Sequence, residues 1–254
     1  MKKLLLILLS FILFSAFMQP EKELKNDLQK DNIKGAVKSI TEIAHKATYG
    51  DSGKPVKGDF EYIYTTSYNS KGEITEKASL AKDKTLLSKS SCKFDKKGVK
   101  TEMDNLNADG TPDSKETYKY DAKDNVIEAD EFQNDGKQTE KFTWKYDDKG
   151  NDIEMKDYNE KDSLILSYKY TYDAQSYNTK IEGFNGTGGL ISTTTMTNDA
   201  NGNYTYWKAH YVSITIDYEY TYQYTYDKTG NWIKRLKFQN GYEIEIVQRE
   251  IAYF

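Results

Sequence analysis

Apolar and polar residues alternate along much of the chain, and the stretch DYEYTYQYTYDKTGNW at residues 217–232 shows this most clearly. Tyrosine occupies every second position from Tyr218 to Tyr226, with polar residues between. Because alternate side chains of a strand face the same way, these five tyrosines lie on one face. The pattern predicts a β-strand with an aromatic face.

A short motif, aromatic–Asp/Asn–x–x–Gly or a close variant, recurs at a regular interval. Its copies begin at Tyr68, Phe94, Tyr120, Tyr146, Tyr172, Asn198 and Tyr226. Five successive spacings are 26 residues and the last is 28. A second turn-forming segment, such as LNADG at Leu106, follows most copies after twelve residues. Each repeat is therefore predicted to hold two strands and two tight turns.

The residue types in the motif explain why it forms a turn. Asp or Asn begins the turn by accepting hydrogen bonds from backbone amides ahead of it. Gly or Asn then adopts the left-handed conformation that a short hairpin needs. Connections this short force neighbouring strands to run antiparallel, so the sequence predicts a meander.

The two faces of each predicted strand differ in polarity. Before one turn, Phe142, Trp144 and Tyr146 share a parity, while Thr143 and Lys145 occupy the other. After the turns, the apolar parity carries Ile127 and Ala129, Ile153 and Met155, Trp207, and Ile233. The alternate positions are mostly charged. This is the pattern of an antiparallel sheet with one solvated face.

The expected fold class is all-β, an antiparallel meander of tandem 26-residue two-strand repeats. Seven motif copies with two strands each predict roughly fourteen strands, and open twisted sheets above about ten strands usually curl or split. The meander is therefore expected to roll into a curved shell, a wide barrel or a sandwich. Residues 24–33 are expected to form a short helix. Residues 36–49 fit a helix or a first strand, and we favour the strand.

The YDxxGN units preceded by Tyr-x-Tyr-Asp resemble the YD repeats of the RHS type, found in bacterial surface and secreted proteins. The resemblance covers residues 60–254. The spacing of 26 is longer than that of the usual YD repeat, and Asp124 and Ser176 replace the final glycine in two copies. Large RHS proteins enclose a toxin in a β shell. This chain is too short for that role, so the resemblance implies only the repeat architecture and an exported location.

The N-terminus has the pattern of an export signal. Lys2 and Lys3 precede a largely apolar run from Leu4 to Met18, which has the length of a signal-peptide core and is short for a membrane-spanning helix. An uncleaved anchor is the alternative, and it would be the chain's only contact with a membrane. We therefore divide the chain into a signal peptide (1–18), an N-terminal segment (19–59) and the repeat domain (60–254). The expected location is periplasmic, outer-surface or secreted.

Composition narrows the function classes. The net charge is −4 with 30% charged residues of both signs, so no basic surface predicts nucleic-acid binding. The mean hydropathy of −0.84 excludes a polytopic membrane protein. Cys92 is the single cysteine, so no internal disulfide can form.

Catalytic and metal chemistry find little support in the sequence. His45 and His210 are far apart and belong to no paired motif. Residues from Asp199 onward resemble a calcium loop, but Tyr204 and His210 stand where an EF-hand needs glycine and glutamate. The turn interpretation is favoured, and we expect no enzyme activity, no metal and no cofactor.

The aromatic face leaves two functional hypotheses open. One is a non-enzymatic exported repeat protein that acts as a structural or interaction module, with another envelope protein as its partner. The alternative is a carbohydrate-binding module, since concave aromatic faces can stack sugar rings. The candidate ligand-binding residues are Tyr118, Trp144, Tyr170, Tyr218, Tyr220, Tyr222 and Tyr224.

Overall fold

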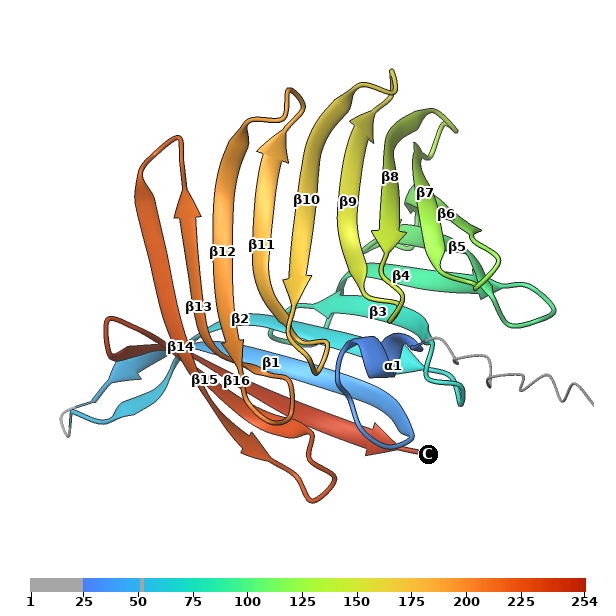
Figure 1. Cartoon of the computed structure of the whole chain (residues 1–254). Helices are drawn as coiled ribbons and strands as arrows, with labels where there is room; N and C mark the ends of the chain where they lie inside the picture. Colours follow the sequence, from blue (N-terminus) through green and yellow to red (C-terminus); the bar gives the residue numbers. More distant parts are fainter. Residues whose placement is uncertain (1–24, 51–52) are drawn as a thin grey trace, which may run out of the picture.

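The computed structural model describes residues 25–50 and 53–254, and the predicted signal peptide lies outside them. One short helix, α1 (Asp27–Lys30), precedes sixteen strands within this described part (Figure 1). The strands are β1 (Val37–Tyr49), β2 (Pro55–Tyr68), β3 (Ile74–Leu80), β4 (Leu86–Phe94), β5 (Lys100–Asn107), β6 (Pro112–Tyr120), β7 (Val126–Gln133), β8 (Gln138–Tyr146), β9 (Asp152–Asn159), β10 (Leu164–Tyr172), β11 (Asn178–Asn185), β12 (Leu190–Asn198), β13 (Tyr204–Tyr211), β14 (Ile216–Tyr226), β15 (Trp232–Gln239) and β16 (Tyr242–Tyr253).

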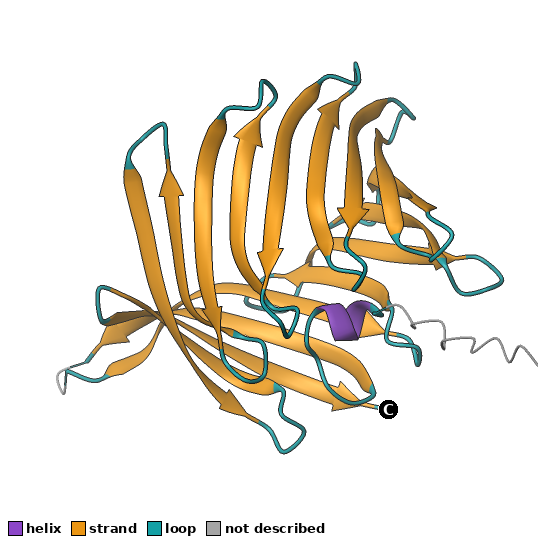
Figure 2. Cartoon of the chain, viewed as in Figure 1, coloured by secondary structure: helices purple, strands orange, loops and turns teal. Residues whose placement is uncertain are grey.

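Each strand pairs antiparallel with the next one along the chain, and β1 pairs with β16. The sheet is therefore a closed barrel, drawn almost wholly as strand in Figure 2. The predicted all-β meander is confirmed, and of the three expected forms of closure the barrel is the one found. The seven motif copies account for β2 to β15. The closing pair, β1 and β16, raises the total above the predicted fourteen.

The turns have the predicted chemistry. In the β8–β9 turn, Oδ1 of Asp147 accepts hydrogen bonds from the amides of Lys149 (2.8 Å) and Asn151 (2.9 Å). Gly150 has φ +76° and its amide donates to the Asp147 carbonyl. Where glycine is missing, Asp124 and Ser176 adopt the same left-handed conformation.

A β-bulge lies beside each of these turns and corrects part of the predicted face assignment. The register shifts where Lys119 and Tyr120 pair with the start of β7. Ile127 is 39% exposed, whereas Ala129, two residues later, is 1% exposed. The prediction that both belong to one buried face is therefore wrong, because the extra residue of a bulge interrupts strict alternation.

The inner face of the barrel carries buried apolar side chains, among them Ala44, Ala129, Met196, Ala209 and Val247. It also carries carboxylates, since Glu131 pairs across strands with Glu116 and with Glu140. The prediction that charge is confined to the other face is wrong. Side chains cannot fill the interior of a sixteen-stranded barrel, so its inner wall is partly hydrated and tolerates charge.

The N-terminal segment forms the predicted short helix and first strand. Asn26 caps α1 by accepting a hydrogen bond from the Gln29 amide, and the Gln29 side chain accepts from the Asn26 amide. The helix is shorter than the predicted range 24–33. Among the described residues, no helix is long and apolar enough to cross a membrane.

Candidate ligand-binding site

A cavity of about 660 Å³ lies inside the barrel at the end occupied by α1. Residues 30–33 form one side of it, and strands from both ends of the chain form the rest. Its aromatic and charged lining includes Tyr64, Tyr68, Tyr224, Trp232, Glu42, Arg235 and Arg249. The volume falls in the range of small-molecule sites, about 300–1,000 Å³.

The predicted tyrosine row runs along the inner face of β14 toward this cavity. Tyr218 is 36% exposed near the β13–β14 turn, and Tyr224 lines the cavity itself. Tyr224 lies six positions after Tyr218 on the strand, so the row spans roughly 20 Å. Midway, the Tyr220 ring stacks on Trp207 with 5.5 Å between ring centroids and 29° between planes.

The deeper phenols of the row are hydrogen-bonded. The Tyr224 hydroxyl donates to the Tyr204 carbonyl at 2.9 Å, and the Tyr226 hydroxyl donates to the Asp199 carboxylate. Burial, aided by Asp199, raises the pKa of Tyr226 to about 12. These two tyrosines are structural anchors. Tyr218 and Tyr220, nearer the open rim, are better placed for a ligand.

The other predicted site residues lie on the inner face but away from the cavity. Tyr118 on β6, Trp144 on β8 and Tyr170 on β10 pair across strands with Ala129, Met155 and Ile181. The Tyr118 hydroxyl donates to Glu116 at 2.9 Å. The structure thus brings Tyr218, Tyr220, Tyr222 and Tyr224 together in one strip. It places Tyr118, Trp144 and Tyr170 on another part of the wall.

An arginine pair beside the row was missed by the sequence reasoning. The Arg249 guanidinium lies 3.4 Å from the centroid of the Trp232 ring and contacts Glu42 at 2.6 Å. Arg235 contacts Glu245 at 2.9 Å and lies 5.8 Å from the centroid of Tyr222. Burial lowers the pKa of Arg249, with Glu42 acting against it.

A signal for this pair existed in the composition. Arg235 and Arg249 are the only arginines among 36 basic residues. Arginine's planar fork suits buried ion pairs and aromatic stacking better than lysine does. Chemically, the cavity offers aromatic faces, guanidinium donors and carboxylate acceptors within one hydrated space. That combination can bind a polyhydroxylated ligand.

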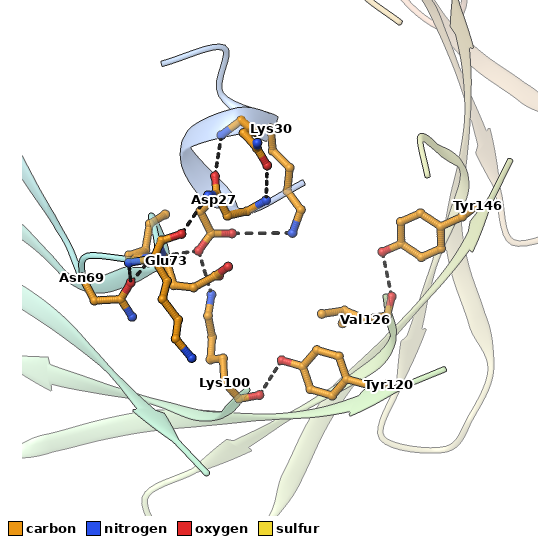
Figure 3. Close-up of polar contacts among 12 residues, drawn as sticks. Asp27, Lys30, Asn69, Glu73, Lys100, Tyr120, Val126 and Tyr146 are labelled. Atoms are coloured by element: carbon orange, nitrogen blue, oxygen red, sulfur yellow. Dashed lines mark hydrogen bonds and ion pairs between the residues drawn. The ribbon is translucent and has the colours of Figure 1, made fainter. Parts of the chain in front are cut away.

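A second, smaller cavity of about 240 Å³ lies beside α1 (Figure 3). Oδ2 of Asp27 accepts a hydrogen bond from the Ile74 amide at 2.9 Å and lies 3.5 Å from the Lys100 ammonium. Burial acts to raise the pKa of Asp27, but Lys100, the Ile74 amide and Lys30 outweigh it and lower that pKa. Burial and then Asp27 raise the pKa of Glu73.

His45, His210 and Asp199, which the sequence analysis considered for catalysis or metal binding, line neither cavity. Nδ1 of His210 lies 2.6 Å from Oδ1 of Asp217 on the adjoining strand. His45 packs edge-on against Phe60. Oδ1 of Asp199 accepts from the amides of Asn201 and Asn203, as a turn residue does. Within residues 25–50 and 53–254, no group of three or more His, Cys, Asp and Glu side chains could hold a metal ion.

No family model and no curated protein sequence matches the chain. Among solved structures, it is similar to a porin-like protein from Bacteroides uniformis, with 14% identity and a TM-score of 0.58 over 86% of this chain and 99% of that chain. A Tc holotoxin pore of Photorhabdus luminescens matches with 14% identity and a TM-score of 0.36, over 78% of this chain and 12% of that chain. That lower score supports no conclusion. The likeness to the Bacteroides uniformis protein shows a shared barrel fold.

Proposed function

We propose that the protein is an exported, non-enzymatic barrel that binds carbohydrate along the inner face of β14. The observation that carries this proposal is the aromatic strip from Tyr218 to Tyr224, which ends in a cavity lined by two guanidinium groups and two carboxylates. Sugar rings present apolar faces that stack on aromatic rings, and hydroxyl edges that bond to charged groups. The strip and the cavity supply both kinds of contact.

The charged side chains on the outer face of the barrel support the proposal that this face is in contact with water. Lys145 pairs with Glu154 at 2.9 Å, and Lys119 pairs with Asp130 at 3.4 Å, both across neighbouring strands. A lysine on the lipid face of a membrane barrel costs roughly 2–4 kcal/mol at the bilayer midplane. We therefore propose a water-facing barrel, carried across the inner membrane by the predicted signal segment. We also propose that the 26-residue repeats are YD-type repeats.

A second candidate function, an interaction module for another envelope protein, is favoured by the β13–β14 turn. Most other turns at that end contain Asn, Asp or Gly, but this one is VSIT and, with the residue after it, exposes Val212, Ile214 and Ile216 together. It also lies in the repeat with the longer spacing of 28 residues. An exposed apolar group of this kind marks a contact surface.

A glycan array probed with the purified mature protein tests the carbohydrate proposal. Tyr218→Ala and Tyr220→Ala should each weaken binding to any hit by about tenfold or more, which corresponds to about 1.4 kcal/mol. Tyr206→Ala is the matched control, because Tyr206 precedes Trp207 on β13 and belongs to the opposite face. Thermal melts must show that all variants fold. An array with no hits for folded wild-type protein would remove the proposal.

A further inference from the structure

The N-terminal segment bonds to turns around one end of the barrel. Lys25 donates to the Asn151 side chain in the β8–β9 turn, and the Leu28 amide donates to the Gly72 carbonyl in the β2–β3 turn. Lys34 exchanges two backbone hydrogen bonds of 2.8 Å with the Asn231 side chain in the β14–β15 turn. These turns belong to opposite sides of the closed sheet. The segment therefore crosses the barrel end.

The crossing segment is packed into the barrel as well as tied to its turns. Leu28 and Ile33 are buried, and they form a hydrophobic cluster with Val37, Ile40, Tyr68 and Ile74. Figure 1 shows α1 at the end of the barrel where the arrows of β8 and β10 end. The cluster packs the segment against β1, β2 and β3. Residues 25–34 are the floor of the interior on this side, and the large cavity lies directly against residues 30–33.

The opposite end is accessible. On the inner face near the β13–β14 turn, Tyr211 and Tyr218 are exposed although their rings contact each other edge-on. In the part of the chain that the structure describes, the hairpins at this rim end freely and no segment crosses between them (Figure 2). The interior is thus open at the rim. At the other end residues 30–33 cover the large cavity, and the smaller cavity lies beside α1 against the β4–β5, β6–β7 and β8–β9 turns.

We infer that the barrel recognises the free end of a carbohydrate chain and not its internal units. This inference rests on the proposed carbohydrate function. A chain that enters along Tyr218 and Tyr220 meets the floor after the length of the tyrosine row, so it cannot thread through. Its terminal sugar reaches the cavity, where Arg249 contacts both Trp232 and Glu42.

The test is the number of protein molecules bound per carbohydrate chain. The probes are hexasaccharides of α-1,4-glucose, β-1,4-glucose and β-1,4-N-acetylglucosamine, each beside a long soluble chain of the same linkage. Calorimetry and sedimentation should give one protein per chain at both lengths for the linkage that binds. An increase in bound protein with chain length would overturn end recognition while leaving carbohydrate binding intact.

Two variants locate the end of the bound chain. Tyr218→Ala at the rim and Arg249→Lys at the floor should both lower hexasaccharide affinity by about tenfold. Tyr206→Ala should leave it unchanged. Loss of affinity with Tyr218→Ala alone, with folded Arg249→Lys binding as wild type does, would contradict a chain end at the floor. Absence of binding to all three hexasaccharides would contradict the proposed function and this inference together.

Discussion

Arg249 is held between an aromatic ring and a carboxylate. Its guanidinium lies 3.4 Å from the Trp232 ring centroid, and its Nε donates to Oε1 of Glu42 at 2.8 Å. The three residues come from β16, β15 and β1, and β1 and β16 are the pair that closes the barrel. The contact therefore joins the two ends of the chain.

Removal of this guanidinium should destabilise the barrel strongly. Arg249→Ala leaves Glu42 half-buried without its partner, and we expect a loss of roughly 3 kcal/mol in the free energy of unfolding. Urea unfolding measures it. Adding Glu42→Gln to Arg249→Ala should recover part of the loss, because the uncompensated charge disappears. A double variant as unstable as the sum of both single variants would show that the ion pair is unimportant.

Asn231 should matter more than its equivalents in other repeats. Its buried side chain exchanges two hydrogen bonds with the Lys34 backbone and donates to the Tyr253 hydroxyl at 2.9 Å. Asn231→Ala should cost about 2 kcal/mol and increase hydrogen exchange at the Lys34 amide. Asn125→Ala is the control, since Asn125 occupies the same turn position and its side chain donates within its own turn, to Asp121. Equal losses for both variants would contradict the role of Asn231 in holding the floor.

Substitution of Gly150 tests whether the repeat turns need a left-handed backbone at this position. It has φ +76°, and an added Cβ would meet no atom within 4 Å. Gly150→Val should therefore destabilise only through the left-handed backbone, by roughly 1 kcal/mol or more. Asp148→Ala in the same turn should be near neutral. Unfolding midpoints in urea that are the same for both variants would refute the assigned turn conformation.

The carboxyl pair beside α1 makes stability depend on pH. The pKa of Glu73 is raised above its ordinary value of 4.5 by burial and by Asp27. A raised folded-state pKa contributes stability below the ordinary value, and this is lost as pH rises through the folded value. Glu73→Gln should thus be more stable than wild type at pH 7–8, with the difference vanishing below pH 4.5. Glu160→Gln, at an exposed turn, is the control. A difference that does not change with pH would contradict the assignment.

The repeat architecture could be predicted because its causes are local. Asp147 and Gly150 lie within one turn, and their chemistry alone requires a tight antiparallel connection. Repetition of that turn then requires a meander. The faces were less predictable, since a bulge separates Ile127 from Ala129 and its presence depends on pairing with β6.

The closure and the arginine pair could not be predicted from local patterns. Closure depends on contacts such as Ala44 opposite Val247, which are about two hundred residues apart in sequence. The cavity forms only when β1 pairs with β16, because Glu42 and Arg249 meet across this pair. The tyrosine row could be found from its period of two, but its relation to the floor depends on the path of residues 25–34.

Intrinsic tryptophan fluorescence during a hexasaccharide titration tests most directly whether carbohydrate binds along the inner face of β14. The chain has three tryptophans, Trp144, Trp207 and Trp232, and all three lie on the inner face. We expect a saturable change in emission that Trp207→Phe reduces and Tyr206→Ala leaves intact, because Trp207 stacks on Tyr220 within the row and Trp232 lines the cavity at the end of the row. A hexasaccharide that binds the protein without changing the emission of any tryptophan would place the site outside the barrel and contradict binding along the inner face of β14.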